Sequence, residues 1–148
     1  MLMGKDRPVE LLLIEDNSGD ILLTKEAFEE IQFAENMSVV TDGEAAIDFL
    51  YKRGRFSDAP TPDLIILDLN IPRVNGRELL AKIKSDNLLK KIPVIVLSTS
   101  KSDRDIKTCY DLQANCYLIK PVDFEEFLEI VTYIRDFWLG MVKIPSMV

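Results

Sequence analysis

Five short stretches of consecutive apolar residues occur along the chain. Four are strong, at residues 11–14, 64–67, 94–97 and 117–119, and a weaker one lies at 37–40. Within each stretch the apolar residues are continuous and do not alternate with polar ones. Continuous runs of this length are typical of strands that helices cover on both faces of a parallel sheet. The pattern therefore predicts five buried strands.

Segments with the 3.6-residue spacing of amphipathic helices follow the predicted strands. Their apolar stripes begin at Ile21, Ala45, Leu79, Ile106 and Phe124; the first includes Leu22, the fourth includes Tyr110, and the last extends to about Leu139. Five β-α units with right-handed crossovers give an α/β fold, with one doubly wound, five-stranded parallel sheet. The 148 residues fit a single domain, with a core over about 9–139, an extension over 140–148 and an enlarged loop over 52–63.

Composition excludes several classes of function. Lys and Arg number 18 and Asp and Glu 25, so the net charge of −7 argues against nucleic-acid binding by bulk charge. Histidine is absent, which excludes Ser-His-Asp and Cys-His catalysis and His-ligated zinc. The two cysteines, Cys109 and Cys116, are too few for a four-cysteine zinc site and fit a reducing compartment. No apolar run has the length of a signal peptide or a membrane span, so we expect a cytoplasmic protein.

Polar side chains of related chemistry follow four of the five predicted strands. Glu15 and Asp16 follow the first, Asp68 and Asn70 the third, Ser98 the fourth and Lys120 the fifth. In an open parallel sheet, the carboxyl ends of the strands form the edge where ligands bind. Three neighbouring carboxylates repel one another unless a cation compensates them, and an all-oxygen donor set suits Mg²⁺. The Ser98 hydroxyl and the Lys120 ammonium suit an anion, so the combination favours phosphoryl transfer to an aspartate.

Each of these residues also has an ordinary structural explanation. The segment 16–18 could cap a helix, Asp68 could end a strand because aspartate favours turns, and Lys120 could be a surface charge. The functional interpretation rests on the combination of these residue types at four strand ends.

The same residues resemble the receiver domains of two-component response regulators. The resemblance runs from about Val9 to Leu139 and includes the acidic pair Glu15-Asp16, the segment 68–76, Ser98, Tyr117 and Lys120-Pro121. It implies a flavodoxin-like receiver fold and a signalling phosphoacceptor rather than an enzyme, whose only catalysis is its own phosphorylation and dephosphorylation. It also implies a sensor histidine kinase as the phosphodonor.

The resemblance implies a role for each position. Asp68 would be the phosphoacceptor. Mg²⁺ would be held by Asp16, Asp68 and the backbone carbonyl of Asn70, with Glu15 acting directly or through water. Lys120 would pair with a phosphoryl oxygen, and the Lys120–Pro121 peptide would be cis.

The family's switch would be formed by Ser98 and Tyr117. Ser98 would move to hydrogen-bond the phosphoryl group, and Tyr117 would rotate inward behind it. Thr99 departs from the pattern, because the family usually has Ala or Gly after the switch hydroxyl. The larger side chain could restrict access to the site, which leaves the rates of phosphorylation and dephosphorylation open.

Four further features resemble the small single-domain response regulators that pair with cyanobacterial phytochromes. They are the enlarged loop 53–62, the segments Ser98-Thr99-Ser100 and Asn115-Cys116-Tyr117, and residues 136–139. This resemblance implies a light-regulated, phytochrome-type histidine kinase as the donor. About nine residues follow Leu139, too few for a DNA-binding module, so we expect no effector domain and an output through the receiver's own surface.

The last predicted helix carries more apolar surface than one sheet face requires. One stripe is Phe127, Val131, Ile134 and Trp138, and a second, displaced stripe is Ile130, Tyr133, Phe137 and Met141. An aromatic patch left in water usually marks a protein–protein surface, and C₂ dimers are the commonest assembly. We therefore expect a homodimer through Ile130, Tyr133, Phe137, Trp138 and Met141, unless residues 140–148 fold back over the second stripe.

Three other functions are alternatives to the phosphoacceptor. A haloacid-dehalogenase-like phosphatase would need a second aspartate as general acid where this chain has Asn70, and it would need room for a cap domain. A pseudo-receiver that binds without phosphorylation would lack the acceptor, the acidic pair or the lysine; none is lost, although Thr99 keeps this alternative open. A flavodoxin-like redox protein would need a phosphate loop rich in Gly and hydroxyls, whereas Glu15, Asp16 and Asn17 would repel a flavin phosphate.

Overall fold

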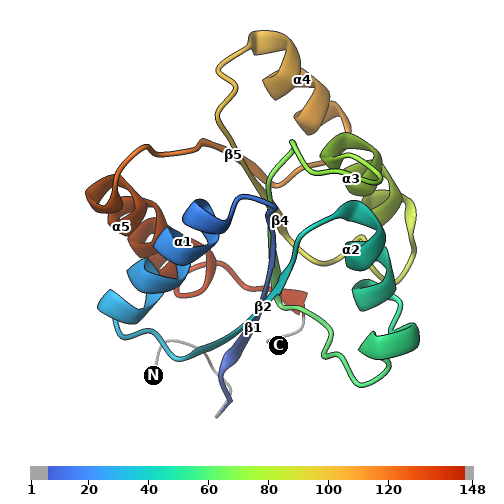
Figure 1. Ribbon diagram of the computed structural model, residues 1–148, viewed down its shortest axis with the longest axis horizontal. Coiled ribbons are helices and arrows are strands. Elements are labelled where there is room, and N and C mark those ends of the chain that lie inside the picture. Colours follow the sequence, from blue (N-terminus) through green and yellow to red (C-terminus); the bar gives the residue numbers. More distant parts are fainter. Residues whose placement is uncertain (1–6, 146–148) are drawn as a thin grey trace.

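The computed structural model describes residues 7–145 and contains one five-stranded parallel sheet. The strands are β1 (Val9–Ile14), β2 (Glu35–Val40), β3 (Leu64–Leu67), β4 (Val94–Ser98) and β5 (Cys116–Ile119). Their order across the sheet is β2-β1-β3-β4-β5, with every neighbouring pair parallel (Figure 1). The predicted α/β, doubly wound architecture is confirmed.

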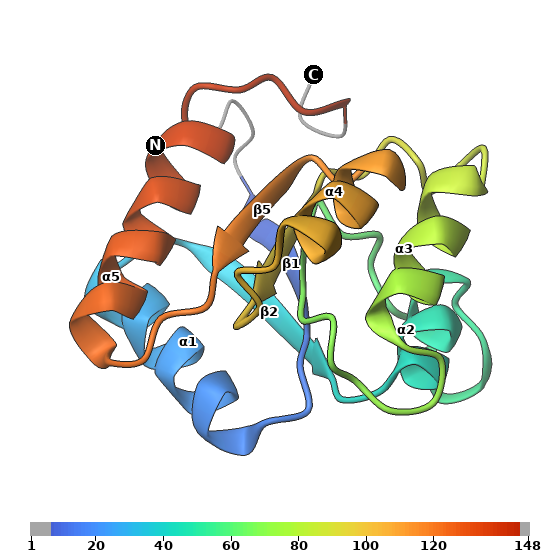
Figure 2. The same ribbon diagram turned by 90° about the horizontal axis from the view of Figure 1, so that it is seen from above.

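Helices cover both faces of this sheet. They are α1 (Ser18–Glu30), α2 (Gly43–Leu50), α3 (Gly76–Ser85), α4 (Asp103–Asp111) and α5 (Phe124–Tyr133). Helix α5 continues without a break into the wider turns of Ile134–Trp138, and a short 3₁₀ turn, Gly54–Phe56, lies in the enlarged loop. Viewed from above, α1 and α5 lie together on one face, and α2 and α3 lie on the other with α4 beside them (Figure 2).

Alternate residues of each central strand pack into one of two apolar layers. In β1 and β3, Leu12 and Ile65 face the layer of α2 and α3, whereas Leu13 and Ile66 face the layer of α1 and α5. All four are at most 2% exposed. Burial on both faces explains why these strands are uniformly apolar in sequence, and it fixes their carboxyl ends on a rigid frame.

The edge strand β2 and two helix positions differ from the prediction. Strand β2 begins at Glu35 and is only partly buried until Val40, so its apolar signal is weak and its start was missed. Leu22 and Tyr110, assigned to buried stripes, are 57% and 48% exposed. Leu22 lies five residues before the buried Ala27, which places it about 140° around the axis of α1. Tyr110 directly follows the buried Cys109, which places it about 100° around the axis of α4.

Side chains cap the start of all five α-helices. The caps are Asn17, Asp42, Asn75, Ser102 and Asp123, each accepting a hydrogen bond from a backbone N–H of the first turn. These bonds satisfy donors that the helix itself leaves free, and they fix the loops between strands and helices. Within residues 7–145, no helix combines the length and apolar character needed to cross a membrane.

Candidate phosphoryl-acceptor site

Three carboxylates gather at the carboxyl edge of the sheet. Glu15 and Asp16 follow β1, and Asp68 follows the neighbouring strand β3, whose Leu67 pairs with Ile14. One carboxylate oxygen from each of the three acids lies within 4.8 Å of the others. The backbone N–H of Asp68 also donates to the carbonyl of Ile14 at 3.0 Å, so strand pairing itself brings the acids to one level.

Burial makes this cluster costly to ionise. Glu15 and Asp68 are 2% and 5% exposed, whereas Asp16 is open to solvent. Burial raises the pKa of Glu15 to about 7, the neighbouring Asp68 acts in the same direction, and Lys120 opposes them. A cation would compensate the crowded charge, and hard oxygen donors with one solvent-exposed member fit Mg²⁺, which keeps several of its waters.

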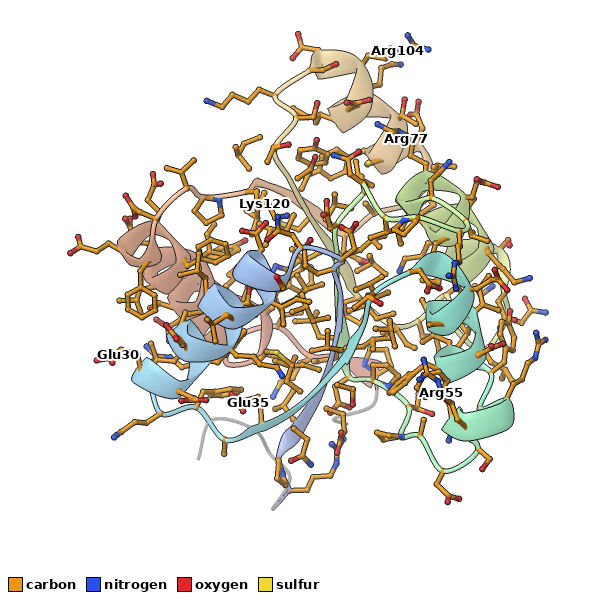
Figure 3. All side chains as sticks on the ribbon, in the orientation of Figure 1. Glu30, Glu35, Arg55, Arg77, Arg104 and Lys120 are labelled. Carbon is orange, nitrogen blue, oxygen red and sulfur yellow. The ribbon has the colours of Figure 1, made fainter. Side chains whose placement is uncertain are left out.

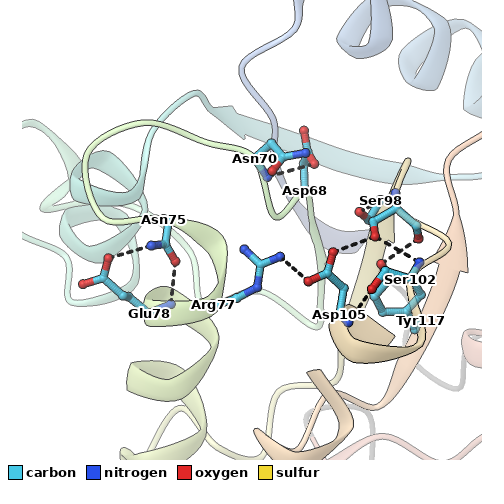
Figure 4. A network of polar contacts seen from close by, with 10 residues as sticks. Asp68, Asn70, Asn75, Arg77, Glu78, Ser98, Ser102, Asp105 and Tyr117 are labelled. Atoms are coloured by element: carbon cyan, nitrogen blue, oxygen red, sulfur yellow. Dashed lines mark hydrogen bonds and ion pairs between the residues drawn. The ribbon is translucent and has the colours of Figure 1, made fainter. Parts of the chain in front are cut away.

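Asn70 lies beside Asp68. Its backbone N–H donates to Asp68 Oδ1 at 3.2 Å (Figure 4). The contact orients one carboxylate oxygen of Asp68 and leaves the other toward Lys120. The role of the Asn70 carbonyl as a metal ligand stays a prediction.

Lys120 contacts three carboxylates from the end of β5. Its Nζ lies 2.7 Å from Glu15 Oε1, 2.7 Å from Asp20 Oδ2 and 3.2 Å from Asp68 Oδ2. Its side chain is 7% exposed and lies close to the first turn of α1 (Figure 3). Burial alone would lower the pKa of Lys120, but the hydrogen bonds that its ammonium donates to Asp20 and Glu15, together with the charge of Asp68, outweigh burial and raise that pKa. Lys120 is therefore a fixed positive charge against Asp68.

Asp20 was not singled out from the sequence. It lies in the first turn of α1, where its backbone N–H donates to the capping side chain of Asn17 at 2.9 Å. A helix that starts directly after β1 places its first turn at the same sheet edge as Glu15 and Asp16. The sequence does show an acid in the first turn of this helix. Its contact with Lys120, however, depends on how α1 is rotated about its axis, which the sequence does not indicate.

Both proposed switch residues are bonded to Ser100 in the loop between β4 and α4. Ser98 ends β4, is 1% exposed, and its Oγ accepts from the backbone N–H of Ser100 at 3.1 Å. The half-buried Tyr117 donates its hydroxyl to the carbonyl of Ser100 at 2.9 Å. Neither contacts Asp68 in any hydrogen bond of the described residues, so the predicted movements start from this arrangement.

The expected cis peptide between Lys120 and Pro121 is wrong. No peptide bond within residues 7–145 is cis. A trans X–Pro bond is favoured by about 0.5–1 kcal/mol, and Lys120 reaches all three carboxylates with the trans bond.

Thr99 is exposed at the mouth of the site. Together with Lys101, Lys120, Val122 and Glu126 it lines an open groove of about 440 Å³ between the end of β4 and α5. Thr99 and Lys120 line the same groove, and whether Thr99 slows access to Asp68 stays a prediction. The cluster as a whole combines a buried carboxylate, an acidic pair that could hold a cation and a fixed ammonium, which are the groups that accepting a phosphoryl group requires.

Comparison with known proteins supports the same chemistry. Residues 11–132 match the family model described as the response regulator receiver domain. Response regulator Rcp1 of Synechocystis sp. is 40% identical over 139 residues, covering 94% of this chain and 95% of Rcp1. The probable methanogenesis regulatory protein FilR2 of Methanothrix harundinacea is 39% identical, covering 98% of this chain and 93% of FilR2.

Solved structures show the same architecture. The phosphorylated cyanobacterial phytochrome response regulator RcpA is 44% identical and superposes with a TM-score of 0.89, covering 94% of this chain and 99% of that chain. The Mn²⁺-bound form of Rcp1 superposes with a TM-score of 0.86, covering 93% of this chain and 99% of that chain.

Proposed function

Because the chain belongs to the response regulator receiver family, we propose that Asp68 accepts a phosphoryl group with Mg²⁺ bound beside it. The observation that carries this assignment is the contact between Lys120 Nζ and Asp68 Oδ2 at 3.2 Å, inside the acidic cluster. A buried lysine aimed at a buried aspartate neutralises charge at the atom that would bear the phosphoryl group.

The chain's own groups prepare Asp68 for attack on phosphorus. The Asn70 N–H holds Oδ1, and Lys120 holds Oδ2. As the oxygen–phosphorus bond to Asp68 forms, the bond from phosphorus to the donor atom breaks, and an acyl phosphate remains. Lys120 then faces the added negative charge, and the Ser98 hydroxyl can leave the Ser100 N–H to donate to a phosphoryl oxygen.

Magnesium is the proposed cation. Glu15, Asp16, Asp68 and the Asn70 carbonyl would hold it, and it would neutralise charge on the phosphoryl oxygens during transfer. Support comes from the all-oxygen donor set, in which one oxygen of each acid lies within 4.8 Å of the others, and from the raised pKa of Glu15, to which burial and the neighbouring Asp68 both contribute. Rcp1, a similar protein, has been solved with Mn²⁺, an ion of the same ligand preference.

A phytochrome-type histidine kinase is the proposed donor. RcpA, at 44% identity, is a phytochrome response regulator, whereas FilR2 is named for a different process, so the test must compare kinases. Purified phytochrome-type kinase, labelled on its histidine, should transfer the label within a minute, and an unrelated histidine kinase should transfer at least ten times more slowly. Asp68→Asn should receive none. Equal rates from both kinases would refute the phytochrome assignment and leave the acceptor assignment intact.

The output is proposed to be a homodimer through α5. The residues Phe127, Val131 and Ile134 of the first stripe are each 1% exposed, so that stripe faces the core. In the second stripe, Tyr133 and Phe137 are each 39% exposed, and their rings stack with centroids 5.5 Å apart.

Residues 139–145 leave this second stripe open. Leu139 and Ile144 pack inward at 0% and 1% exposure, while Met141 is 73% exposed. Residues 146–148, which complete the segment of the expected fold-back, lie outside the described part of the chain. A continuous aromatic and Met surface, with Ile130 and Trp138 half-buried at its border, fits a second copy of the chain.

Sedimentation at micromolar concentration tests the dimer. The wild type should sediment as a dimer and Phe137→Glu as a monomer, because a buried carboxylate would lack a partner. Leu88→Glu is the matched control: Leu88 is 78% exposed in the segment between α3 and β4, and its substitution should leave the dimer unchanged. A wild type that stays monomeric would refute the interface.

A cytoplasmic location belongs to the same proposal. Cys109 and Cys116 are both free thiols, which suits a reducing compartment. Asp68 chemistry would be limited to gain and hydrolysis of its own phosphoryl group, without turnover of other substrates.

A further inference from the structure

Ser100 connects the two switch residues to one another. Its backbone N–H donates to Ser98 Oγ at 3.1 Å, and its carbonyl accepts from the Tyr117 hydroxyl at 2.9 Å. Its own hydroxyl donates to Asp105 Oδ2 at 2.6 Å. The position of a single loop residue therefore decides where both switch hydroxyls find their partners.

Asp105 anchors Ser100 to two helices. It lies in the first turn of α4, where its backbone N–H donates to the capping Ser102 Oγ at 3.3 Å. Its second oxygen, Oδ1, accepts from Arg77 Nη2 of α3 at 2.8 Å (Figure 4). The Ser102 N–H closes the loop by donating to Ser100 Oγ at 3.2 Å. The loop is thus fixed on α4 by hydrogen bonds and on α3 by an ion pair.

Arg77 leads back to the acceptor. It is the second residue of α3, and the preceding Gly76 donates its N–H to the carbonyl of Leu69, next to Asp68. A continuous series of bonds therefore connects the loop that follows Asp68 with Ser100. It passes through the Gly76–Leu69 hydrogen bond, Arg77 and Asp105. The side chains of Arg77 and Asp105 are 37% and 26% exposed, so solvent weakens the attraction between their charges. The ion pair therefore acts mainly by fixing the position of the Asp105 carboxylate.

We propose that Asp105, held by Arg77, is a positioning residue that fixes Ser100 and thereby restrains the hydroxyls of Ser98 and Tyr117. This restraint rests on the proposed phosphorylation of Asp68, since it opposes the movement of Ser98 toward a phosphoryl group. In this proposal, Ser98 gives up the N–H of Ser100 when it makes that movement. A fixed Ser100 keeps this N–H in place and makes the movement less favourable, whereas a loosened Ser100 releases Ser98 more readily.

The first test follows Tyr117 in metal-free protein and needs no phosphorylation. The chain has four tyrosines, so fluorotyrosine labelling gives four ¹⁹F resonances, and Tyr117→Phe identifies the relevant one. Asp105→Ala should move the Tyr117 resonance toward its solvent-exposed position, and Arg77→Met should move it in the same direction by less. Asp105→Asn, which keeps an oxygen to accept from Ser100, should stay near the wild type.

Asp103→Ala is the matched control. Asp103 is an exposed acid in the same first turn of α4, so its loss removes the same helix-terminal charge without touching Ser100. An unchanged Tyr117 resonance in Asp105→Ala, or an equal change in Asp103→Ala, would overturn the proposal. If Asp105→Ala does not fold, Arg77→Met decides by the same criterion.

The second test measures affinity for beryllofluoride, a phosphoryl analogue, in the presence of Mg²⁺. Loss of one restraining hydrogen bond should make Asp105→Ala bind about 2- to 5-fold more tightly than the wild type. Equal or weaker binding would overturn the restraint on Ser98. A wild type that binds no beryllofluoride and gains no phosphoryl group would count against the function of Asp68, while the Tyr117 measurement would still decide the role of Asp105.

Discussion

The ammonium of Lys120 lies 2.7 Å from Asp20, the same distance that separates it from Glu15. Asp20 is outside the group of acids that could hold a metal ion. Lys120 therefore has one carboxylate partner that a bound cation does not need. That partner can keep Lys120 at the site while Glu15 and Asp68 turn to the cation.

Asp20→Asn should weaken Mg²⁺ binding by roughly 2- to 10-fold, the range that 0.4–1.4 kcal/mol of lost electrostatic attraction gives. A negative charge near the cation is removed, and Lys120 then competes more strongly for Glu15 and Asp68; both effects act in the same direction. Titration with Mn²⁺ followed by electron paramagnetic resonance measures the change. Glu44→Gln, an exposed acid in the first turn of α2, serves as control and should bind as the wild type does. Unchanged affinity in Asp20→Asn would show that Asp20 does not take part.

Lys120→Met should lower the free energy of unfolding of metal-free protein by about 3 kcal/mol, because it leaves buried carboxylates unpaired. Mg²⁺ should restore part of this loss. Urea denaturation with chelator and with Mg²⁺ measures both. The control is Lys107→Met, whose ion pair with Asp111 spans 4.0 Å between side chains 77% and 70% exposed, and which should cost no more than roughly 0.5 kcal/mol. A loss as small as that of the control would mean that Lys120 is not needed to balance the acids.

Gly76→Ala should destabilise the fold by about 1–3 kcal/mol and slow phosphorylation of Asp68. A Cβ at this position would lie 2.5 Å from Leu69 Cα and 2.9 Å from the carbonyl of Asp68, so the acceptor loop would have to move. Gly19→Ala, in the first turn of α1, meets only the Asn17 side chain at 3.2 Å and should stay within about 1 kcal/mol of the wild type. Thermal unfolding and the phosphorylation rate check the pair, and a Gly76→Ala protein that matches the wild type in both would contradict the close packing.

The contact between Asp105 and Ser100 should keep its full strength through neutral pH and weaken only in acid. The hydroxyl of Ser100, then Arg77 of α3 and Arg104 of α4, lower the pKa of Asp105, while partial burial acts against them. A lowered pKa in the folded state means that the stabilisation is present above the usual aspartate range and is lost as the pH falls through the lowered value.

The Tyr117 resonance should therefore hold constant from pH 8 to pH 5, relative to Asp105→Asn measured in parallel. Any titration that the two proteins share belongs to other groups, such as Glu15. A difference between them that develops between pH 6 and pH 8 would contradict the assignment.

Much of the site could be predicted from sequence because, in a parallel sheet, the residues that follow the strands all lie along one edge. Residues that follow β1, β3, β4 and β5 must meet at one edge, so the meeting of Glu15, Asp68 and Lys120 depended only on finding the strands. The fold was accessible for the same reason, since both faces of the central strands are buried and their apolar runs are uninterrupted.

What the sequence missed depends on the orientation of helices. Asp20 reaches Lys120, and Asp105 reaches Arg77, only because α1, α3 and α4 present these side chains at one rotation about their axes. Leu22 illustrates the same limit for an apolar residue. The sequence assigned it to the buried stripe of α1, but it lies far enough around the helix to be exposed to solvent. The isomer of Lys120–Pro121 was carried over from a resemblance, and no feature of the residues themselves required it.

Intact-protein mass after incubation with a small phosphodonor tests the central claim most directly. Wild type with Mg²⁺ should gain the mass of a single phosphoryl group, and the adduct should be absent with chelator. Asp68→Asn should gain nothing under any condition, while Asp16→Asn should gain little because the cation is held less well. A wild type that stays unmodified, with the small donor and with a phosphorylated histidine kinase alike, would contradict the function proposed for Asp68. An adduct that persists in Asp68→Asn would contradict it equally.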